Sequence, residues 1–560
     1  MRVAAVFAGI KELPNILSAH RGNSGMRTTQ QPANNVRNVA VIGAGPSGIA
    51  CARYLIKHGA TVTVFERHSD VGGQWDCSSP YSAVWPSMHT NTCSLTTRFS
   101  DMEHSGDTAM FPANEVIHTY LREYADTFRV LEHILFSTEV LLVSPADAAD
   151  AEKGAWRLVW FSDARGEESG FFDAVVVASG RCSVPNIPVI SGIESFCGDL
   201  GVIHSSKYRT NDTYEGKRVV VAGGSTSGCE IASDIASREA EVISSVRRAR
   251  YVFQRIMGGR PAEYINLTRF GMLWSEVITP EEDEAEFKEF ITSRCGRPDQ
   301  YGGLTPHDDI MEAGATMSQE YLLFIAEDRI VQKPWIRHIA GQRVYFDDGT
   351  AVDNVDGLIL CTGFDISLPF LDAPVREVLK PKQVHLPLAW YTMHPDLPEL
   401  YFAGFGLPNG SMFLVAEQQA RFIAYQCCDV VRRIPKAVIK RARSNYMATP
   451  HLHGMLFVNR LTIQHARLSG FEADMAAYPE LARYLLFGPL TPATFRLSGV
   501  DALPDGAERV VREAHTYSQM TSPRMTGEEQ RMLRNLAERK NDPAFSAIVL
   551  QILKVQQGMM

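Results

Sequence analysis

The sequence predicts an α/β protein with two parallel sheets, because two separate segments open in the same way. Val39–Ile42 and Val219–Val221 are short β-branched runs, and each leads directly into a glycine-rich turn. A helical pattern follows each turn, over Ile49–His58 and Cys229–Ala236. Strand, glycine turn and helix form the start of a βαβ unit. Two such openings, about 180 residues apart, predict two Rossmann-like dinucleotide-binding domains.

Further elements fit this architecture. Val175–Val177 and Leu358–Leu360 have the composition of strands that are buried on both faces of a parallel sheet. Between the two openings, the pattern predicts a helix near Glu115–Phe128 and a polar hairpin near Trp156–Phe172.

The order of the elements predicts that the second domain is inserted in the first. Residues 256–335 have the mixed pattern of an insertion, in which the acids of Pro280–Glu289 form a solvated helix face. The expected parts are a disordered leader (1–36), a first nucleotide domain (37–195 and 346–470), a second nucleotide domain (196–345) and a mostly helical C-terminal extension (471–560). For the leader, a transit peptide or a functional start at Met26 are the alternatives.

Composition limits the functions to consider. The chain has 560 residues and a net charge of −9, which argues against a general polyanion binder, so nucleic acid is not an expected partner. No stretch reaches the roughly 18–20 apolar residues of a membrane span. The ten cysteines form no C-x-x-C and no metal-ligand spacing, so neither a metal site nor a dithiol is expected. A reduced, cytoplasmic compartment fits best.

The first glycine turn is Gly43-Ala44-Gly45-Pro46-Ser47-Gly48. In this motif Gly43 permits the tight turn, Gly45 lets the backbone approach a pyrophosphate, and Gly48 permits close packing of helix on strand. The helix N-terminus, at Ser47, then offers unpaired N–H groups and a positive dipole end to phosphates. A glycine turn of purely structural use is the alternative.

A carboxylate follows the next strand. Thr61–Phe65 ends in Glu66, 18 positions after Gly48. An acid at this place accepts hydrogen bonds from ribose hydroxyls and repels a 2′-phosphate, so the first site is expected to bind FAD or NAD rather than NADP. The run Gly72-Gly73-Gln74-Trp75 lies just beyond, and its glycines allow close approach to a bulky ligand. An ordinary turn is the alternative for this run.

The second turn, Gly223-Gly224-Ser225-Thr226-Ser227-Gly228, is a degenerate copy of the first. Ser225 takes the middle glycine position, where its hydroxyl can serve as an additional donor. Three arginines follow the strand Val242–Val246, at Arg247, Arg248 and Arg250. Arg247 is 19 positions after Gly228, where the first site carries its acid. A guanidinium suits a 2′-phosphate through bidentate hydrogen bonds, whereas a solvated basic turn is the alternative. The two sites together predict FAD and NADPH, with hydride transfer between them.

At this point the chain resembles the class B flavin-dependent monooxygenases, specifically the flavin-containing monooxygenase family, from about Asn38 to Gly499. The matching motifs are Glu66 with Gly72-Gly73-Gln74-Trp75, Thr90-Asn91 before Phe111-Pro112, Ser227–Ala232, Leu360-Cys361-Thr362-Gly363-Phe364, Glu417–Arg421, and Phe487-Gly488-Pro489 with Phe495-Arg496-Leu497. The resemblance implies that Thr362 and Gly363 belong to a turn that contacts cofactor. It also implies that Asn91 lies near the reactive part of the flavin and the nicotinamide, with an ordinary Asx turn as the alternative.

The family's fingerprint between the two sites, F-x-G-x-x-x-H-x-x-x-Y/F, is matched in part. Phe196, Gly198, His204 and Tyr208 are its equivalents, with two extra residues between Gly198 and His204. The resemblance implies that His204 and Tyr208 couple the position of NADP to the flavin, and a plain linker is the alternative. Related Baeyer–Villiger enzymes usually end this fingerprint in Trp instead of Tyr.

The activity that the resemblance implies is NADPH- and O2-dependent oxygenation of a small molecule. Members reduce FAD with NADPH and hold a C4a-hydroperoxyflavin, shielded by NADP⁺, until substrate arrives. We therefore expect N- or S-oxygenation of a soft nucleophile. A Baeyer–Villiger reaction on ketones and an NADPH-dependent flavoprotein reductase are the alternatives. Association into a homo-oligomer is left open, and the sequence does not encode the identity of the substrate.

Overall fold

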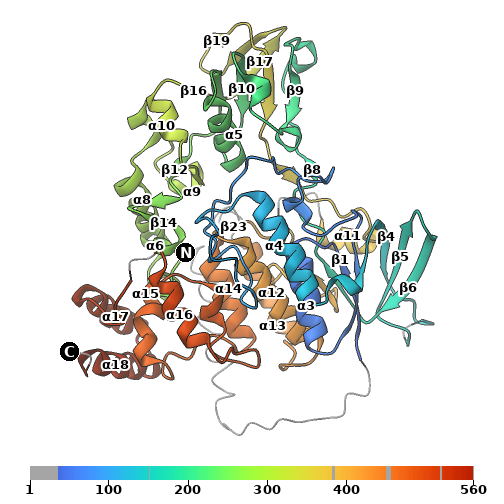
Figure 1. Ribbon diagram of the computed structural model, residues 1–560, viewed down its shortest axis with the longest axis vertical. Coiled ribbons are helices and arrows are strands. Elements are labelled where there is room, and N and C mark those ends of the chain that lie inside the picture. The colour runs from blue at the N-terminus through green and yellow to red at the C-terminus, as the bar shows by residue number, and fades with distance from the viewer. Residues whose placement is uncertain (1–35, 151, 381–384, 449–455, 518–519, 559–560) are drawn as a thin grey trace.

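The computed structural model describes residues 36–150, 152–380, 385–448, 456–517 and 520–558. The expected disordered leader lies outside these described residues, except for Val36. The fold is α/β, as predicted. Figure 1 shows the first sheet at the lower right, the second sheet at the top, and the C-terminal helices at the lower left.

The first sheet consists of five parallel strands in the order β22-β7-β1-β2-β3. These strands are β1 (Asn38–Ile42), β2 (Thr61–Phe65), β3 (Ile134–Leu135), β7 (Ala174–Val177) and β22 (Leu400–Phe402). In the central strand, Val39 lies opposite Val62 on one side and Ala174 on the other. Alternate residues of β1 enter two different hydrophobic cores, one on each face. Burial on both faces explains why the run is apolar throughout instead of alternating.

The second sheet repeats this arrangement, again with five parallel strands, in the order β16-β11-β10-β20-β9. Its strands are β9 (Gly201–His204), β10 (Arg218–Ala222), β11 (Glu241–Ser245), β16 (Ile330–Lys333) and β20 (Gly357–Leu360). Val219 and Val221 enter one core, and Val220 and Ala222 enter the other. Each of the four β-branched runs therefore forms a strand, as predicted.

The second sheet extends further along the chain than expected. Leu358 of β20 lies opposite Val220 of β10 and Val202 of β9. A three-stranded antiparallel sheet precedes β20 and contains β17 (Ile336–Ala340), β18 (Arg343–Phe346) and β19 (Ala351–Val352). The expected return to the first domain at residue 346 does not match this pairing, which places the return after Leu360. A buried strand has the same composition in either sheet, so the run could not reveal its partner.

Two connections join the domains, and they pair with each other. β8 (Val184–Pro185) leaves the first domain, and β21 (Phe364–Asp365) returns to it as the antiparallel partner of β8. Asn186 N–H donates to the carbonyl oxygen of Gly363 at 2.9 Å. The antiparallel pair of β8 and β21, called the paired crossing below, therefore links the two domains.

Helices and a smaller sheet cover the first sheet. α3 (Pro46–Lys57) packs against α12 (Met412–Cys427), and α12 is buried along nearly its whole length although it carries several polar residues. The predicted helix near Glu115–Phe128 is α4 (Asn114–Thr127), and the predicted hairpin forms the last two strands of an antiparallel sheet. That sheet contains β4 (Thr138–Pro145), β5 (Trp156–Ser162) and β6 (Gly166–Phe172). The remaining elements of this domain are α11 (Ala373–Leu379), α13 (Lys436–Met447), α14 (Val458–Leu468), β23 (Pro408–Asn409) and β24 (Leu456–Phe457).

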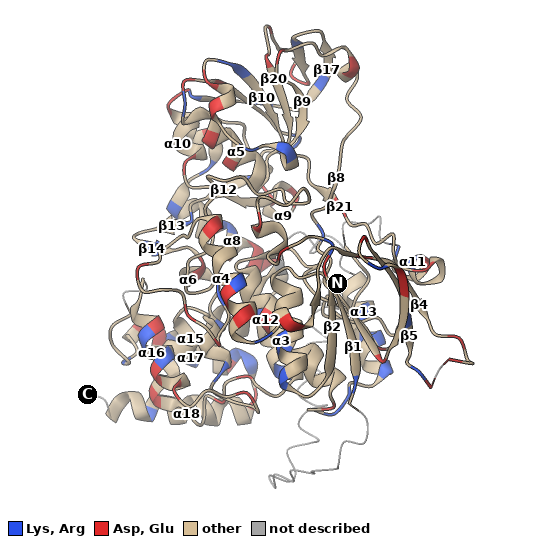
Figure 2. Cartoon of the chain, turned by 45° about the vertical axis from the view of Figure 1, so that its right-hand side comes forward, with Lys and Arg blue, Asp and Glu red and all other residues tan. Residues whose placement is uncertain are grey.

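The expected insertion lies between the second sheet and the C-terminal helices (Figure 1). β12 (Tyr251–Phe253) directly precedes it, and its elements include β13 (Ile256–Met257), β14 (Arg260–Pro261), α6 (Glu263–Asn266), α7 (Arg269–Ser275), α8 (Pro280–Cys295), α9 (Ile310–Ala313), β15 (Ala315–Met317) and α10 (Tyr321–Ala326). The acidic run begins α8, where Thr279 and Glu282 form a capping box. Glu281 and Glu289 are exposed, so the run lies on a solvated face. Figure 2 shows acidic and basic residues interspersed over this part of the chain.

The C-terminal extension is mostly helical, as predicted. It contains α15 (Ala482–Phe487), α16 (Gly506–His515), α17 (Gly527–Lys540) and α18 (Pro543–Gly558). Across the described part of the chain, no helix combines the length and the apolar character that crossing a bilayer requires.

A buried polar network fixes this extension to the first domain. Arg496 donates from Nη1 to the Tyr54 hydroxyl at 2.9 Å and to the Asp101 carboxylate at 2.7 Å. It also donates to the Ser100 hydroxyl. Glu417 on α12 accepts from the Tyr54 hydroxyl at 2.8 Å and from the Ser100 N–H at 3.1 Å. The network therefore joins α3, the loop after residue 93, α12 and the extension in one buried cluster.

We predict that Arg496→Met destabilises the protein by about 3–5 kcal/mol, because it removes the cation that pairs with the buried Glu417 and one of the two arginines that pair with Asp101. Thermal unfolding of the purified protein measures the change. Arg512→Met is the control, since Arg512 forms an exposed ion pair with Glu103 and its loss should cost less than about 1 kcal/mol. Similar shifts in the two variants would contradict the assignment.

Candidate functional site

The first glycine turn has the geometry of a phosphate cradle. Gly43 has φ +105°, in the region that favours glycine, and a Cβ on Gly48 would lie 1.8 Å from the Gly43 carbonyl oxygen. α3 begins at Pro46, directly after this turn, and no side chain caps its N-terminus. The N–H groups of its first turn are therefore available to an anion.

Glu66 lies beside this cradle, at the end of β2. Its Oε2 accepts from the Ala44 N–H at 2.7 Å, and its Oε1 accepts from the His68 N–H at 2.8 Å. Each carboxylate oxygen keeps a further lone pair, so Glu66 can still accept hydrogen bonds from ribose hydroxyls. The same charge opposes a second phosphate at this position.

The Gly72–Trp75 loop lies against the glycine turn. A Cβ on Gly73 would be 3.0 Å from the Cα of Gly45, so the two glycines permit the close approach. The Gln74 side chain is used within its own loop, because Oε1 accepts from the Ala83 N–H at 2.9 Å. Trp75 is half-buried and packs towards Phe413 of α12. In this structure Gln74 and Trp75 shape the loop, while Gly73 lets the loop lie close to the glycine turn.

Other strands of the first sheet end at the same edge, with residues that the sequence analysis missed. Ser179 follows β7, and its Oγ is buried without a hydrogen-bond partner among the described residues. Gly404 follows β22, with φ +79°, and a Cβ there would lie 2.7 Å from the Ser47 Oγ. Both follow a buried strand, as Gly43 and Glu66 do, which is the signal that could have identified them.

The second glycine turn copies the first. Gly223 has φ +138°, and a Cβ on Gly228 would lie 1.8 Å from the Gly223 carbonyl oxygen. Ser225 is the N-cap of α5 (Thr226–Ala236), but its side chain makes no capping hydrogen bond. Ser225 and Ser227 are both exposed. Their hydroxyls and the free N–H groups of α5 therefore face an open cradle.

The arginine turn lies against this second cradle. A Cβ on Gly224 would be 2.9 Å from Cγ1 of Val246, the residue before Arg247. Arg248 donates to the Glu312 carbonyl oxygen at 2.9 Å, and burial lowers the pKa of Arg250. Arg247 is exposed and forms no hydrogen bond or ion pair with any residue that the structure describes. Of the three arginines, Arg247 is the one left free for a 2′-phosphate.

The fingerprint residues lie at the crossing between the domains. His204 is buried, and its Nε2 is 3.0 Å from the Gly363 carbonyl oxygen. Thr362 Oγ1 donates to the Asn186 carbonyl oxygen at 2.5 Å. Gly363 has φ +85° with open space around it, so its backbone conformation alone requires glycine. His204, Thr362 and Gly363 therefore hold the paired crossing together.

Tyr208 supports α5. The side chain is fully buried, and its hydroxyl donates to Asp234 of α5 at 2.5 Å. The structure thus gives Tyr208 an indirect place beside the second cradle, and its role in coupling NADP to the flavin stays a prediction. Packing also requires glycine at position 198, because a Cβ there would lie 2.5 Å from the carbonyl oxygens of Val355 and Asp356.

Asn91 lies in a loop ordered by the Phe111-Pro112 segment. The N–H of Thr90 donates to the Pro112 carbonyl oxygen at 2.9 Å, which explains why the two motifs occur together. The Oδ1 of Asn91 and the Oγ1 of Thr90 are buried without a hydrogen-bond partner among the described residues. Buried polar atoms are nearly always satisfied in native proteins, so these two atoms can accept hydrogen bonds from a bound cofactor or from water. The residues present thus fit two dinucleotides, FAD at the first sheet and NADPH at the second.

Comparison with known proteins identifies the chemistry that these sites serve. A family described as flavin-binding monooxygenase-like matches residues 36–554. The chain belongs to this family. It is an FAD-dependent monooxygenase that uses NADPH.

Curated relatives and solved structures agree with this assignment. The monooxygenase is 30% identical over 485 residues to the N-oxide-forming dimethylaniline monooxygenase 2 of Pan troglodytes, covering 83% of this chain and 89% of the relative. It is 28% identical over 488 residues to human flavin-containing monooxygenase 1, with the same two shares. The S-allyl-L-cysteine S-oxygenase structure from Allium sativum matches with a TM-score of 0.53 and 22% identity, over 94% of this chain and 99% of that one. An open structure of cyclohexanone monooxygenase matches with a TM-score of 0.58 and 18% identity, over 78% and 98%. The two structures share the fold.

We predict that Arg247→Ala raises the KM for NADPH by about 10- to 100-fold, the effect of losing charge-assisted hydrogen bonds. The KM for NADH should stay the same, because NADH lacks the 2′-phosphate. Steady-state kinetics with both reductants measures this difference. Arg343→Ala, at an exposed arginine of β18 paired with Asp353, is the control. Equal effects of Arg247→Ala on both reductants would remove Arg247 from this role.

Proposed function

We propose that this monooxygenase transfers one oxygen atom of O2 to the nitrogen or sulfur of a small, soft nucleophile. The observation that carries this proposal is the buried Oδ1 of Asn91, which has no hydrogen-bond partner among the residues that the structure describes, in a chain related over most of its length to N-oxide-forming enzymes. A substrate with an electron-rich amine or thioether fits an electrophilic oxygen donor. The enzyme needs no acid–base pair of its own, because the cofactor performs the chemistry.

The first domain, which we place at residues 37–195 and after Leu360, would hold FAD, and the second, from residue 196 to Leu360, would hold NADPH. The free N–H groups of α3 would face the FAD pyrophosphate, and Glu66 its ribose. The free N–H groups of α5 and the Arg247 guanidinium would hold the phosphates of NADPH. When bound, FAD accepts the hydride of NADPH and activates O2.

The chain itself contributes orientation and the exclusion of water. Asn91 has both an amide donor and an acceptor, so it can orient a polar group of either cofactor or hold a proton donor close to the reacting atoms. Burial of Thr90 and of the Asn91 oxygen keeps water from competing for these hydrogen bonds. The paired crossing of β8 and β21 fixes how the two domains meet.

We also propose a cytoplasmic location. The ten cysteines of the chain are all free thiols in the structure, and several of them are buried, as expected of a protein that folds under reducing conditions.

Product analysis with a tertiary amine, a thioether and a ketone, each supplied with NADPH and O2, tests the proposed reaction. We expect the N-oxide and the sulfoxide to form, with consumption of NADPH in proportion, and the ketone to be recovered unchanged. An ester or lactone as the main product would instead establish a Baeyer–Villiger enzyme. NADPH oxidation without any oxygenated product would establish an oxidase or reductase.

A further inference from the structure

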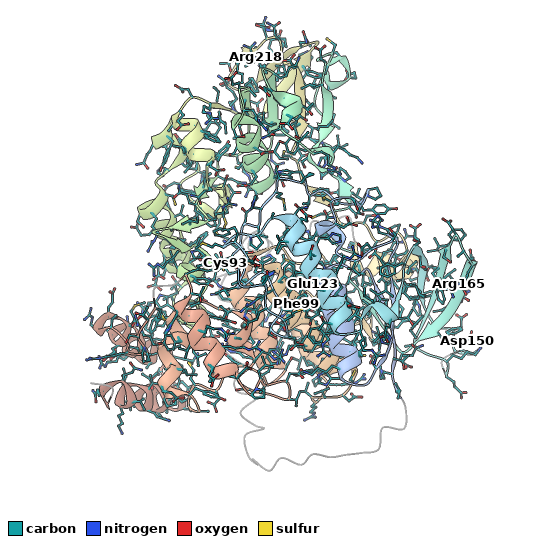
Figure 3. The ribbon with its side chains drawn as sticks, in the orientation of Figure 1. Cys93, Phe99, Glu123, Asp150, Arg165 and Arg218 are labelled. Atoms are coloured by element: carbon teal, nitrogen blue, oxygen red, sulfur yellow. The ribbon has the colours of Figure 1, made fainter. Side chains whose placement is uncertain are left out.

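The insertion of the second domain contacts the loop that carries Asn91. Glu263 begins α6, and its Oε1 accepts from the Cys93 N–H at 2.7 Å and from the Thr96 hydroxyl at 3.0 Å. Cys93 lies two positions after Asn91. Figure 3 shows Cys93 where the insertion, the C-terminal helices and the first domain meet. A carboxylate of the insertion therefore holds the backbone two positions from Asn91.

A second contact holds the other end of the same loop. Arg255, the residue before the insertion, donates from Nη1 to the Thr90 carbonyl oxygen at 3.4 Å. Its guanidinium also lies over the ring of Phe111, 5.1 Å from the centroid. Asn91 thus lies between Thr90, which Arg255 contacts, and Cys93, which Glu263 contacts.

The surroundings of Glu263 do not suit a purely structural carboxylate. The residue is 5% exposed, and its Oε2 is buried without a hydrogen-bond partner within the described part of the chain. Burial raises the pKa of its carboxyl group. Its contacts there are neutral donors, with no ion pair to any described residue. A charge-bearing group in such a place is costly to bury, so a function for it is worth testing.

Direct binding of substrate does not explain Glu263. The cavity beside it, between the insertion, Ser411 at the start of α12 and Leu490 of the C-terminal extension, measures about 10 Å³. A space of this size holds about one water molecule. It cannot contain an amine or thioether substrate, so Glu263 acts on the protein rather than on the substrate.

We propose that Glu263 is a positioning residue that holds the Asn91 loop in place and thereby keeps water from the flavin face. The proposal rests on the role of Asn91 in the proposed function. Oε1 fixes the Cys93 N–H and the Thr96 hydroxyl. Without Glu263 these two hydrogen bonds are lost and the loop is released.

The consequence concerns how NADPH and O2 are used. In the coupled reaction, NADPH, H⁺, O2 and substrate give NADP⁺, oxygenated substrate and water. In the uncoupled reaction, NADPH, H⁺ and O2 give NADP⁺ and H2O2. A loosened Asn91 loop admits water beside the flavin, so it favours the uncoupled reaction.

The test compares Glu263→Ala, Glu263→Gln and wild type, each loaded with FAD and without substrate. Glu263→Ala should raise the rate of H2O2 formation from NADPH by about tenfold, the scale of effect that a displaced site residue has. Glu263→Gln keeps a carbonyl oxygen that can accept from Cys93 and Thr96, so it should restore a rate near that of wild type. Glu289→Gln, at an exposed glutamate of α8, is the matched control and should behave as wild type.

A double variant identifies the path of the effect. Asn91→Ala alone should also raise H2O2 formation, and adding Glu263→Ala should increase it no further, because both changes remove the same constraint. FAD content, thermal midpoint and the rate of flavin reduction by NADPH should stay near wild type in Glu263→Gln. If Glu263→Ala folds poorly, Thr96→Val removes one of the two hydrogen bonds to Oε1 with little change in side-chain volume, and it should raise H2O2 formation in the same direction.

Three outcomes would overturn the proposal. These are a wild-type rate of H2O2 formation in Glu263→Ala, effects of Glu263→Ala and Asn91→Ala that add independently, and loss of FAD from Glu263→Gln, which would mark a merely structural role. Failure of the proposed function is separate, since it appears as wild-type enzyme that oxygenates neither amine nor thioether. The measurement of H2O2 without substrate does not depend on that result.

Discussion

One contact, present twice, determines how this chain is built. In each domain the third glycine of the turn lies so close to the carbonyl oxygen of the first that a Cβ would be 1.8 Å away, for Gly48 against Gly43 and for Gly228 against Gly223. Only glycine fits this contact, which starts the helix directly at the carboxyl end of the strand. The helix N-terminus then faces outward at the sheet edge, where ligands of open α/β sheets bind. Both nucleotide sites depend on this geometry.

Because the two cradles are so similar, we propose that the side chains around them give each site its specificity. The first has a carboxylate, Glu66, held by backbone N–H groups, and the second has an exposed guanidinium, Arg247. The rest of the chain brings the two sites together. The crossing of β8 and β21 fixes one side of the junction, and the insertion and the C-terminal extension close the other side through buried polar contacts with the residue 93–101 loop.

The sequence predicted those parts of the fold and the site that depend on neighbouring residues. The β-branched strands, the glycine turns and the charged residue after the second strand of each domain are local patterns, and the structure contains each of them. The chain was expected to return to the first domain at residue 346, but the strand ending in Leu360 still belongs to the second sheet. A buried apolar run does not indicate which of two parallel sheets it joins. Glu263 was missed for a related reason, since its partner Cys93 lies 170 positions away and only tertiary packing brings them together. Tyr208 matched a family motif, but a motif does not distinguish a buried support from a residue that touches cofactor.

We propose that Glu66 at the first cradle and Arg247 at the second assign FAD to the first site and NADPH to the second. Anaerobic reduction of the wild-type, FAD-loaded enzyme by subsaturating NADPH or NADH tests this claim most directly. We expect the bound flavin to be reduced at least about tenfold faster by NADPH, the effect of one set of charge-assisted hydrogen bonds to the 2′-phosphate. Equal rates with the two reductants, or purified protein that binds no flavin, would contradict it.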